Sequence, residues 1–213
     1  MTENRNIDTT REDAYRLLAA CYYSPTQALL DENCCSALAN LLAVVAPDAA
    51  AHAAEAAAFS GDLSVEALAV EHARLFIGPF QLVAPPYGSI YLDDSKTVMG
   101  DSTAKVATFY HSCGLHMADD FLELPDHFAV ELEFMSYLAF MQREASSVGN
   151  NVEKKRLIGL QKEFLDTFLL PWLQPFTAAV INDGEAPFYQ ALARCTAAFI
   201  KADSEALTVE ADV

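Results

Sequence analysis

One short stretch of the chain gathers three side chains that commonly bind zinc. His111, Cys113 and His116 lie within the segment His-Ser-Cys-Gly-Leu-His, and imidazole and thiolate are good zinc ligands. Zinc sites usually draw on two separated pairs of ligands, but the chain contains neither a C-x-x-C pair nor an H-x-x-x-H pair. We therefore interpret the stretch as a helix end with a buried cysteine, and the sequence predicts no bound metal or other cofactor.

A second group of candidate residues, Asp126, His127 and Glu131, follows Pro125. On a helix, His127 and Glu131 would lie one turn apart and could share a proton or a metal ion. Carboxylate-bridged dimetal bundles need a Glu-x-x-His motif on each of two helices and further inward glutamates, and the chain does not offer this set. Asp126 is at a position typical of a helix N-cap. A cap does not explain why Pro-Asp-His directly follows the acidic and aromatic run 119–123.

The motifs of the common enzyme classes are absent from the sequence. It contains no G-x-S-x-G elbow, no Walker loop and no G-x-G-x-x-G, the usual signatures of hydrolases, NTPases and dinucleotide enzymes. We therefore predict that the protein is not an enzyme. His72 lies on an apolar helical face and is interpreted as a core histidine. The alternative that stays open is a small helical metal-binding protein or enzyme that uses His111, Cys113, His116 and His127.

The composition predicts one globular domain. The chain has 213 residues, of which 53% are hydrophobic and 20% charged, and a single core commonly serves a chain of this length. Its formal net charge is −17, which repels the phosphate backbone of nucleic acids. We therefore expect no nucleic-acid partner, whereas a basic peptide is compatible with this charge.

The termini and the cysteines indicate the compartment. The polar N-terminus lacks the basic and apolar regions of a secretory signal, and the five cysteines form no disulfide framework pattern. No uninterrupted run reaches the roughly 18 apolar residues of a membrane span, because the Ala-rich run 49–59 is shorter and carries His52 and Glu55. We expect a cytoplasmic protein with reduced thiols and no stable membrane insertion.

Apolar residues recur at helical spacing along most of the chain, and no stretch alternates as a strand would. A first helix is predicted with Thr9 or Thr10 as its cap and an end before Pro25. The acidic tail 204–213 is expected to be frayed. The sequence thus predicts an all-α fold, a single-domain helical bundle over residues 1–213. Its further helices are expected at 26–46, 47–60, 64–78, 101–114, 125–146, 151–170, 171–181 and 186–201.

The segment 78–100 interrupts this helical pattern. It is rich in Pro, Gly and apolar residues and has no helical period, so we predict a long ordered loop. Connections of this length without regular structure are often functional. The alternative is that its apolar side chains only seal the loop against the core.

Three stretches together resemble the TorD/DmsD/NarJ family of redox-enzyme maturation chaperones, in its dimethyl sulfoxide and trimethylamine N-oxide reductase branch. They are Glu71–Pro79 (EHARLFIGP), Leu82–Asp93 (LVAPPYGSIYLD) and Glu123–Met135 (ELPDHFAVELEFM). The segment Leu169–Trp172 resembles the family more weakly. The sequence departs from the family pattern at His72, where an aromatic residue is more common, at Tyr87, where many members have Trp, and at Phe168, where a His often stands.

The resemblance implies an all-helical cytoplasmic chaperone. Such a protein binds the twin-arginine signal peptide of a molybdenum-containing reductase and holds this apo enzyme from export until its cofactor is inserted. Carried over by position, the resemblance places the signal-peptide-binding residues at Leu75, Tyr87, Gly88, Gly100, Pro125, Asp126 and His127. The client reductase stays open, and so do the choice between a monomer and a domain-swapped dimer and the binding of guanine nucleotide or molybdopterin cofactor.

The implied site is chemically sensible. A twin-arginine peptide carries two cations followed by an apolar, helix-prone run, so its receptor needs carboxylates beside an apolar groove. Asp126 can supply the charge, together with Glu123 and Asp119 nearby in the sequence. Groove residues are expected among the apolar side chains of Leu75, Phe80 and Tyr87.

Overall fold

The computed structural model describes residues 2–61, 63–78, 82–183 and 185–211, with side chains from residue 7 onward. Within this part of the chain every element longer than an isolated β-bridge is a helix, so the predicted all-α fold is confirmed. The elements are α1 (Thr2–Tyr22), α2 (Gln27–Asp31), α3 (Cys34–Val45), α4 (Pro47–Ser60), α5 (Val65–His72), η1 (Ala73–Ile77), α6 (Gly88–Leu92), α7 (Asp101–Ser112), α8 (Phe128–Ser147), α9 (Asn151–Phe164), η2 (Leu165–Leu169), α10 (Leu170–Asn182) and α11 (Pro187–Ala211).

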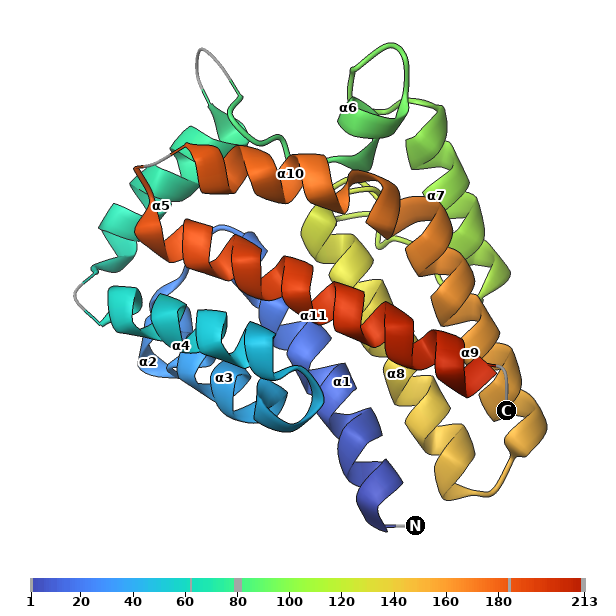
Figure 1. The fold of residues 1–213 in the computed structure, drawn as a ribbon. Coiled ribbons are helices and arrows are strands. Elements are labelled where there is room, and N and C mark those ends of the chain that lie inside the picture. The colour runs from blue at the N-terminus through green and yellow to red at the C-terminus, as the bar shows by residue number, and fades with distance from the viewer. Residues whose placement is uncertain (1, 62, 79–81, 184, 212–213) are drawn as a thin grey trace.

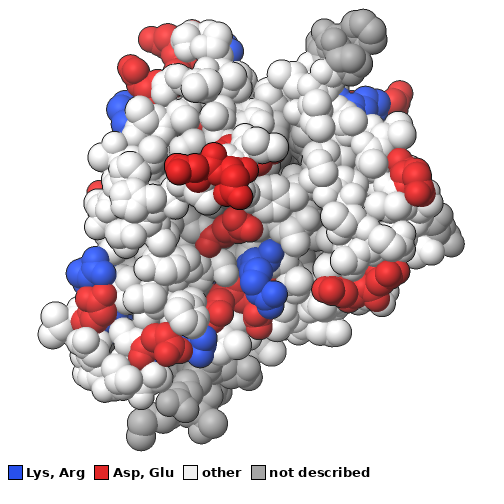
Figure 2. Space-filling view, turned by 180° about the vertical axis from the view of Figure 1, so that it is seen from behind, with Lys and Arg blue, Asp and Glu red and all other residues white. Residues whose placement is uncertain are grey.

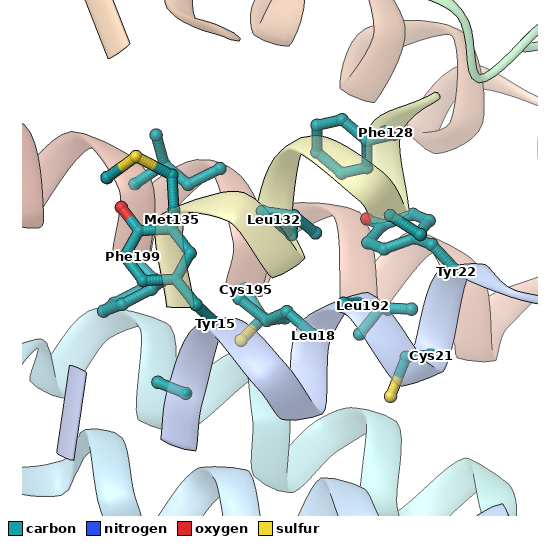
Figure 3. Close-up of a cluster of buried hydrophobic side chains, with 14 of the residues drawn as sticks. Tyr15, Leu18, Cys21, Tyr22, Phe128, Leu132, Met135, Leu192, Cys195 and Phe199 are labelled. Carbon is teal, nitrogen blue, oxygen red and sulfur yellow. The ribbon is translucent and has the colours of Figure 1, made fainter. Parts of the chain in front are cut away.

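The helices form one body in which α1, α8 and α11 are central (Figure 1). Helix α1 packs along α8, and α11 packs on α4 and α10. Figure 3 shows how these three helices share one core, because side chains from each point toward one another. They include Tyr15 and Leu18 of α1, Leu132 and Met135 of α8, and Leu192, Cys195 and Phe199 of α11, all of them buried. The helix expected at 125–146 corresponds to α8 and lies at the centre of this body.

Several predicted helix boundaries were wrong, for local reasons. Helix α1 begins at Thr2, so Thr9 and Thr10 lie inside it and do not cap it. The helix expected at 26–46 is divided into α2 and α3 at Asn33, which adopts a left-handed conformation with φ of 49°. Asparagine tolerates this region better than most residues, but neither Gly nor Pro marks the break in the sequence.

The C-terminal helices are longer than expected. Residues 151–182 form one continuous helical segment, in which Pro171 follows the π-helical turn η2. The hydrogen-bond register changes at such a turn, and the missing N–H of the proline is tolerated there. Helix α11 continues to Ala211, with Asp203 and Leu207 buried. The expectation of a frayed tail from residue 204 is therefore wrong as far as residue 211, and residues 212–213 lie outside the described part.

The segment 151–182 is long and apolar enough to span a membrane by length and composition alone, with a mean hydropathy of 1.3 over its most apolar window. Half of that window is buried inside the protein. Its helices pack on α8 and α11, so the core accounts for its apolar character.

The loop predicted at 78–100 is ordered in the part that the structure describes, but it is not without helices. It contains the five-residue helix α6, and Tyr87 pairs with His127 in an isolated antiparallel bridge. Pro79, Phe80 and Gln81 lie outside the described residues. In Figure 1, α6 lies at the outer end of the molecule, beside α7 and near α10.

Candidate functional site

The loop before α6 and the segment before α8 are held together by backbone hydrogen bonds. The Phe128 N–H donates to the Pro86 carbonyl at 2.8 Å, and the Gly88 N–H donates to the Asp126 carbonyl at 2.9 Å. The bridge between Tyr87 and His127 lies between these two bonds. Two of the three motifs that carry the family resemblance are thus brought side by side.

Asp126 is fully buried and caps a different helix from the one expected. Its Oδ2 accepts the Ser89 N–H at 2.8 Å, in the first turn of α6. The N-cap of α8 is His127, whose Nδ1 accepts the Ala129 N–H at 3.2 Å. The chain stays extended through His127, so α8 begins only at Phe128. The alternative considered from the sequence, that Asp126 is the N-cap of the central helix, is therefore wrong, because the residue stands one position too early.

His127 is buried in an aromatic and acidic neighbourhood whose outer residues are partly exposed. Its ring stacks on Tyr23 with the centroids 5.8 Å apart and meets the Tyr87 ring at 5.2 Å. The Tyr87 hydroxyl donates to Glu123 at 3.0 Å, and the Tyr23 hydroxyl donates to Glu133 at 3.0 Å. We call these five residues, Tyr23, Tyr87, Glu123, His127 and Glu133, the aromatic–acidic edge.

The His127 side chain is uncharged at neutral pH. Burial lowers its pKa to about 4, although Glu123 acts in the opposite direction. Because Nδ1 accepts the Ala129 N–H, the proton of the neutral ring is assigned to Nε2. Nε2 lies 3.9 Å from the Glu123 carboxylate. The edge therefore presents the carboxylate of Glu123 with no cation of its own beside it among the described residues.

Glu131 does not pair with His127 through its side chain, contrary to the pairing considered from the sequence. It is fully buried, and its Oε2 accepts the Trp172 indole N–H at 3.3 Å. Burial, with a further contribution from the charge of Asp126, raises the pKa of Glu131 well above its usual range. Gly88 packs on this pair so closely that a Cβ there would stand 3.2 Å from Trp172 Nε1. The sequence offered no signal for the Trp172 contact.

The other residues implied by the resemblance lie around this centre. Pro125 accepts the Tyr110 hydroxyl at 2.9 Å through its carbonyl. Leu75 is buried in η1, and its carbonyl accepts the Ala84 N–H at 2.9 Å. Gly100 is the N-cap residue that precedes α7, and a Cβ there would collide with the Asp93 carboxylate. Tyr87, Gly88, Pro125, Asp126 and His127 are thus brought together, whereas Leu75 and Gly100 stand at the two ends of the connecting segment.

Exposed apolar side chains lie next to the aromatic–acidic edge. Leu122 is 95% exposed, and Phe121, 41% exposed, meets the Tyr23 ring at 6.5 Å. The neighbouring Asp119 and Asp120 are exposed as well. Figure 2 shows one face of the molecule, on which acidic side chains outnumber basic ones and gather near the middle. Carboxylates and partly or fully exposed apolar side chains therefore lie close together within the run 119–123.

The stretch from His111 to His116 spans the end of α7, as interpreted from the sequence, but its cysteine is not fully buried. His111 and His116 are exposed with their rings 4.5 Å apart, and Cys113 is half-buried with its Sγ 3.9 Å from the Ser112 hydroxyl. Within the described residues no three His, Cys, Asp or Glu side chains are arranged to hold a metal ion.

Comparisons with known proteins point to one family. The model of the family described as "Nitrate reductase delta subunit" matches residues 27–178. The chaperone protein TorD of Shewanella pealeana is 31% identical over 164 residues, which cover 74% of this chain and 68% of TorD. The Tat proofreading chaperone DmsD of Salmonella typhi is 34% identical over 145 residues, which cover 68% of this chain and 64% of DmsD. The chain thus spans about two thirds of the length of these relatives.

A solved structure has the same fold. It is described as a putative redox enzyme maturation protein from Archaeoglobus fulgidus, and it superposes with a TM-score of 0.58 over 87% of this chain and 91% of its own. The two sequences are 23% identical, so this likeness bears on the fold alone.

Proposed function

Because the chain belongs to the nitrate reductase delta subunit family, the TorD/DmsD/NarJ redox-enzyme maturation chaperones, we propose that it binds the twin-arginine signal peptide of a molybdenum-containing reductase. It holds the apo enzyme from export until the cofactor is inserted. The family consists of chaperones rather than enzymes, and TorD/DmsD chaperones are cytoplasmic.

The observation that carries this proposal is the aromatic–acidic edge beside Phe121 and Leu122. A twin-arginine peptide needs carboxylates for its cations and an apolar surface for the run that follows. Glu123 and Glu133 offer carboxylates, and the rings of Tyr23 and Tyr87 offer flat apolar faces.

The residues implied by the resemblance have different parts in this proposal. Tyr87, which is half-buried, contacts the peptide directly, and the buried His127 packs on its ring and positions it. Gly88, Pro125 and Asp126 shape the turn that presents them. Leu75 and Gly100 hold the two ends of the connecting segment.

The test is calorimetric titration with a synthetic twin-arginine leader. We expect a dissociation constant on the order of 1 µM, about −8 kcal/mol. A scrambled peptide of the same charge is the control, and equal affinity for both peptides would show that only the net charge attracts them.

Tyr87 supplies the matched variants. Tyr87→Phe removes the bond to Glu123 and keeps the ring, so we expect a smaller loss of affinity than for Tyr87→Ala, which removes both. Phe140→Ala, a half-exposed ring toward the far end of α8, should bind the leader as the parent does. If Tyr87→Ala is less stable to urea but its folded fraction binds normally, Tyr87 only packs the loop.

A further inference from the structure

Four buried oxygen atoms surround α6 without a hydrogen-bond partner in the described part of the chain. They are the hydroxyls of Ser89 and Tyr91, Oδ1 of Asp126 and Oε1 of Glu131. Ser89, Asp126 and Glu131 are fully buried. Buried polar atoms are nearly always paired, so an unpaired set at one place requires an explanation.

The two carboxyl groups reach the same turn of α6. Asp126 holds the Ser89 N–H through Oδ2, and a Cβ on Gly88 would lie 3.6 Å from Oε1 of Glu131. The other oxygen of Glu131 is held by Trp172. Each carboxyl group is therefore fixed through one oxygen, and its second oxygen is left for another donor.

The chemistry of these two carboxyl groups fits a guanidinium group. An arginine side chain carries five N–H donors and no acceptor, and it binds carboxylates through two parallel bonds. The two carboxyl groups of Asp126 and Glu131 are complementary to such a donor-rich plane. A lysine ammonium has only three donors and lacks the planar fork.

We propose that Asp126 and Glu131 form a buried site for one arginine side chain of the twin-arginine leader, with α6 as its movable cover. The proposal rests on the function proposed above and adds to it the role of Glu131 and the motion of α6. Helix α6 has five residues and packs mainly on α7 and α10. Two bonds, from Gly88 N–H and Ser89 N–H, attach its first turn to Asp126.

The protonation of Glu131 gives the site a signature. Burial and the charge of Asp126 raise the pKa of Glu131 well above its usual range, which favours the protonated form of its carboxyl group in the free protein. The titratable groups that face it are Asp126 and, from α7, Tyr110, while α10 contributes the indole of Trp172, which does not titrate. An arriving guanidinium favours the charged carboxylate, and the proton passes to solvent.

The experiment is calorimetry with the leader and with two leaders in which either arginine is replaced by Gln. Glu131→Gln keeps an acceptor for the Trp172 N–H, and we expect it to weaken leader binding at least tenfold. One of the two Gln leaders should lose affinity on the parent and lose nothing further on Glu131→Gln, as a coupled pair requires. Glu144→Gln makes the same substitution at the exposed far end of α8, away from Asp126, and should bind as the parent does.

Two further measurements test the deprotonation of Glu131 on binding and the motion of α6. Titrations in buffers of different ionisation enthalpy should show a proton released on binding to the parent and none on binding to Glu131→Gln. The Ser89 amide should exchange at least tenfold faster in the complex, because the cover has left Asp126.

The outcomes separate this proposal from the one it rests on. If the parent binds the leader in preference to the scrambled peptide but Glu131→Gln binds it equally well, the buried site is wrong and the proposed function stands. An unchanged Ser89 exchange rate in the complex overturns the moving cover. If the parent shows no preference for the leader, both proposals fail. Asp126→Asn should also weaken binding tenfold or more, and if it fails to fold, Glu131→Gln and the exchange rates decide.

Discussion

His127 shows how burial sets the chemistry of a single residue. It caps α8 through Nδ1, and a ring nitrogen can accept a hydrogen bond only while it is unprotonated. The low pKa of His127 therefore keeps the ring in the neutral form that the cap requires. Protonation would end the cap and place a charge between Tyr23 and Tyr87.

This arrangement predicts a pH-dependent loss of stability that His127→Asn removes. Above pH 6.5 neither the folded nor the unfolded chain binds a proton here, but between 6.5 and about 4 only the unfolded chain does. The parent should therefore lose up to about 3 kcal/mol relative to the variant as the pH falls through this window. Asn is a good cap that does not titrate. Urea unfolding of both proteins at several pH values is the measurement, and a constant difference would mean that His127 does not titrate abnormally.

At the scale of elements, a buried ion pair ties the first helix to the last. The Arg11 guanidinium of α1 donates to both carboxylate oxygens of Asp203 in α11 and also to Gln142 and Gln161. Tyr15 donates its hydroxyl to Asp203 at 2.8 Å. Four helices, α1, α8, α9 and α11, therefore meet at one guanidinium group.

We predict that Asp203→Ala lowers the free energy of unfolding by about 3–5 kcal/mol, because it leaves a buried cation without its partner. The double variant Arg11→Met, Asp203→Leu should recover most of this loss, since neither charge then remains buried. Urea unfolding of the three proteins gives the answer. A double variant no more stable than Asp203→Ala would indicate that packing at Asp203, and not its charge, holds the helices together.

Local signals predicted some elements well. Pro47 and Ser60-Gly61 mark the ends of α4, and Gly114, with φ of 80°, follows the end of α7 as expected. The break at Asn33 was missed because neither Gly nor Pro marks it in the sequence. The continuous helix through Pro171 was missed because no particular residue type indicates the π-helical turn η2 that precedes the proline. The buried end of α11 was missed because its acidic sequence is typical of an exposed tail. The sequence does not reveal that Asp203 pairs with Arg11 of α1.

For the candidate site, the sequence indicated the segments involved but not the contacts that their residues make. The resemblance identified the segments that meet at Tyr87 and His127, and the fold brings them together. The actual partner of Asp126, the Ser89 N–H, is 37 positions away in the sequence. Helical spacing put His127 and Glu131 on one face, but because His127 precedes α8, only Glu131 points into the body toward Trp172.

At the scale of the whole molecule, the net charge of −17 acts on any cationic partner. Such a field speeds association and adds affinity that salt removes, since the screening length falls from about 30 Å at 0.01 M to about 3 Å at 1 M. Contacts in a buried site are screened much less.

We therefore predict that salt weakens the binding of the leader and of its scrambled control by similar factors, so that the ratio of their dissociation constants is kept. Titration of both peptides over a range of salt concentrations measures this ratio. Convergence of the two affinities at high salt would assign the selectivity to surface charge alone.

The position of α11 has a consequence for how the protein is made. This helix carries residues 187–211 and fills the space between α1, α4 and α10, yet it leaves the ribosome after all of them. Until it emerges, Leu18 and Ala53 have no complete core to enter, and the nascent chain exposes apolar surface that favours aggregation. A member of a chaperone family thus itself passes, during its synthesis, through a partly folded state with exposed apolar surface.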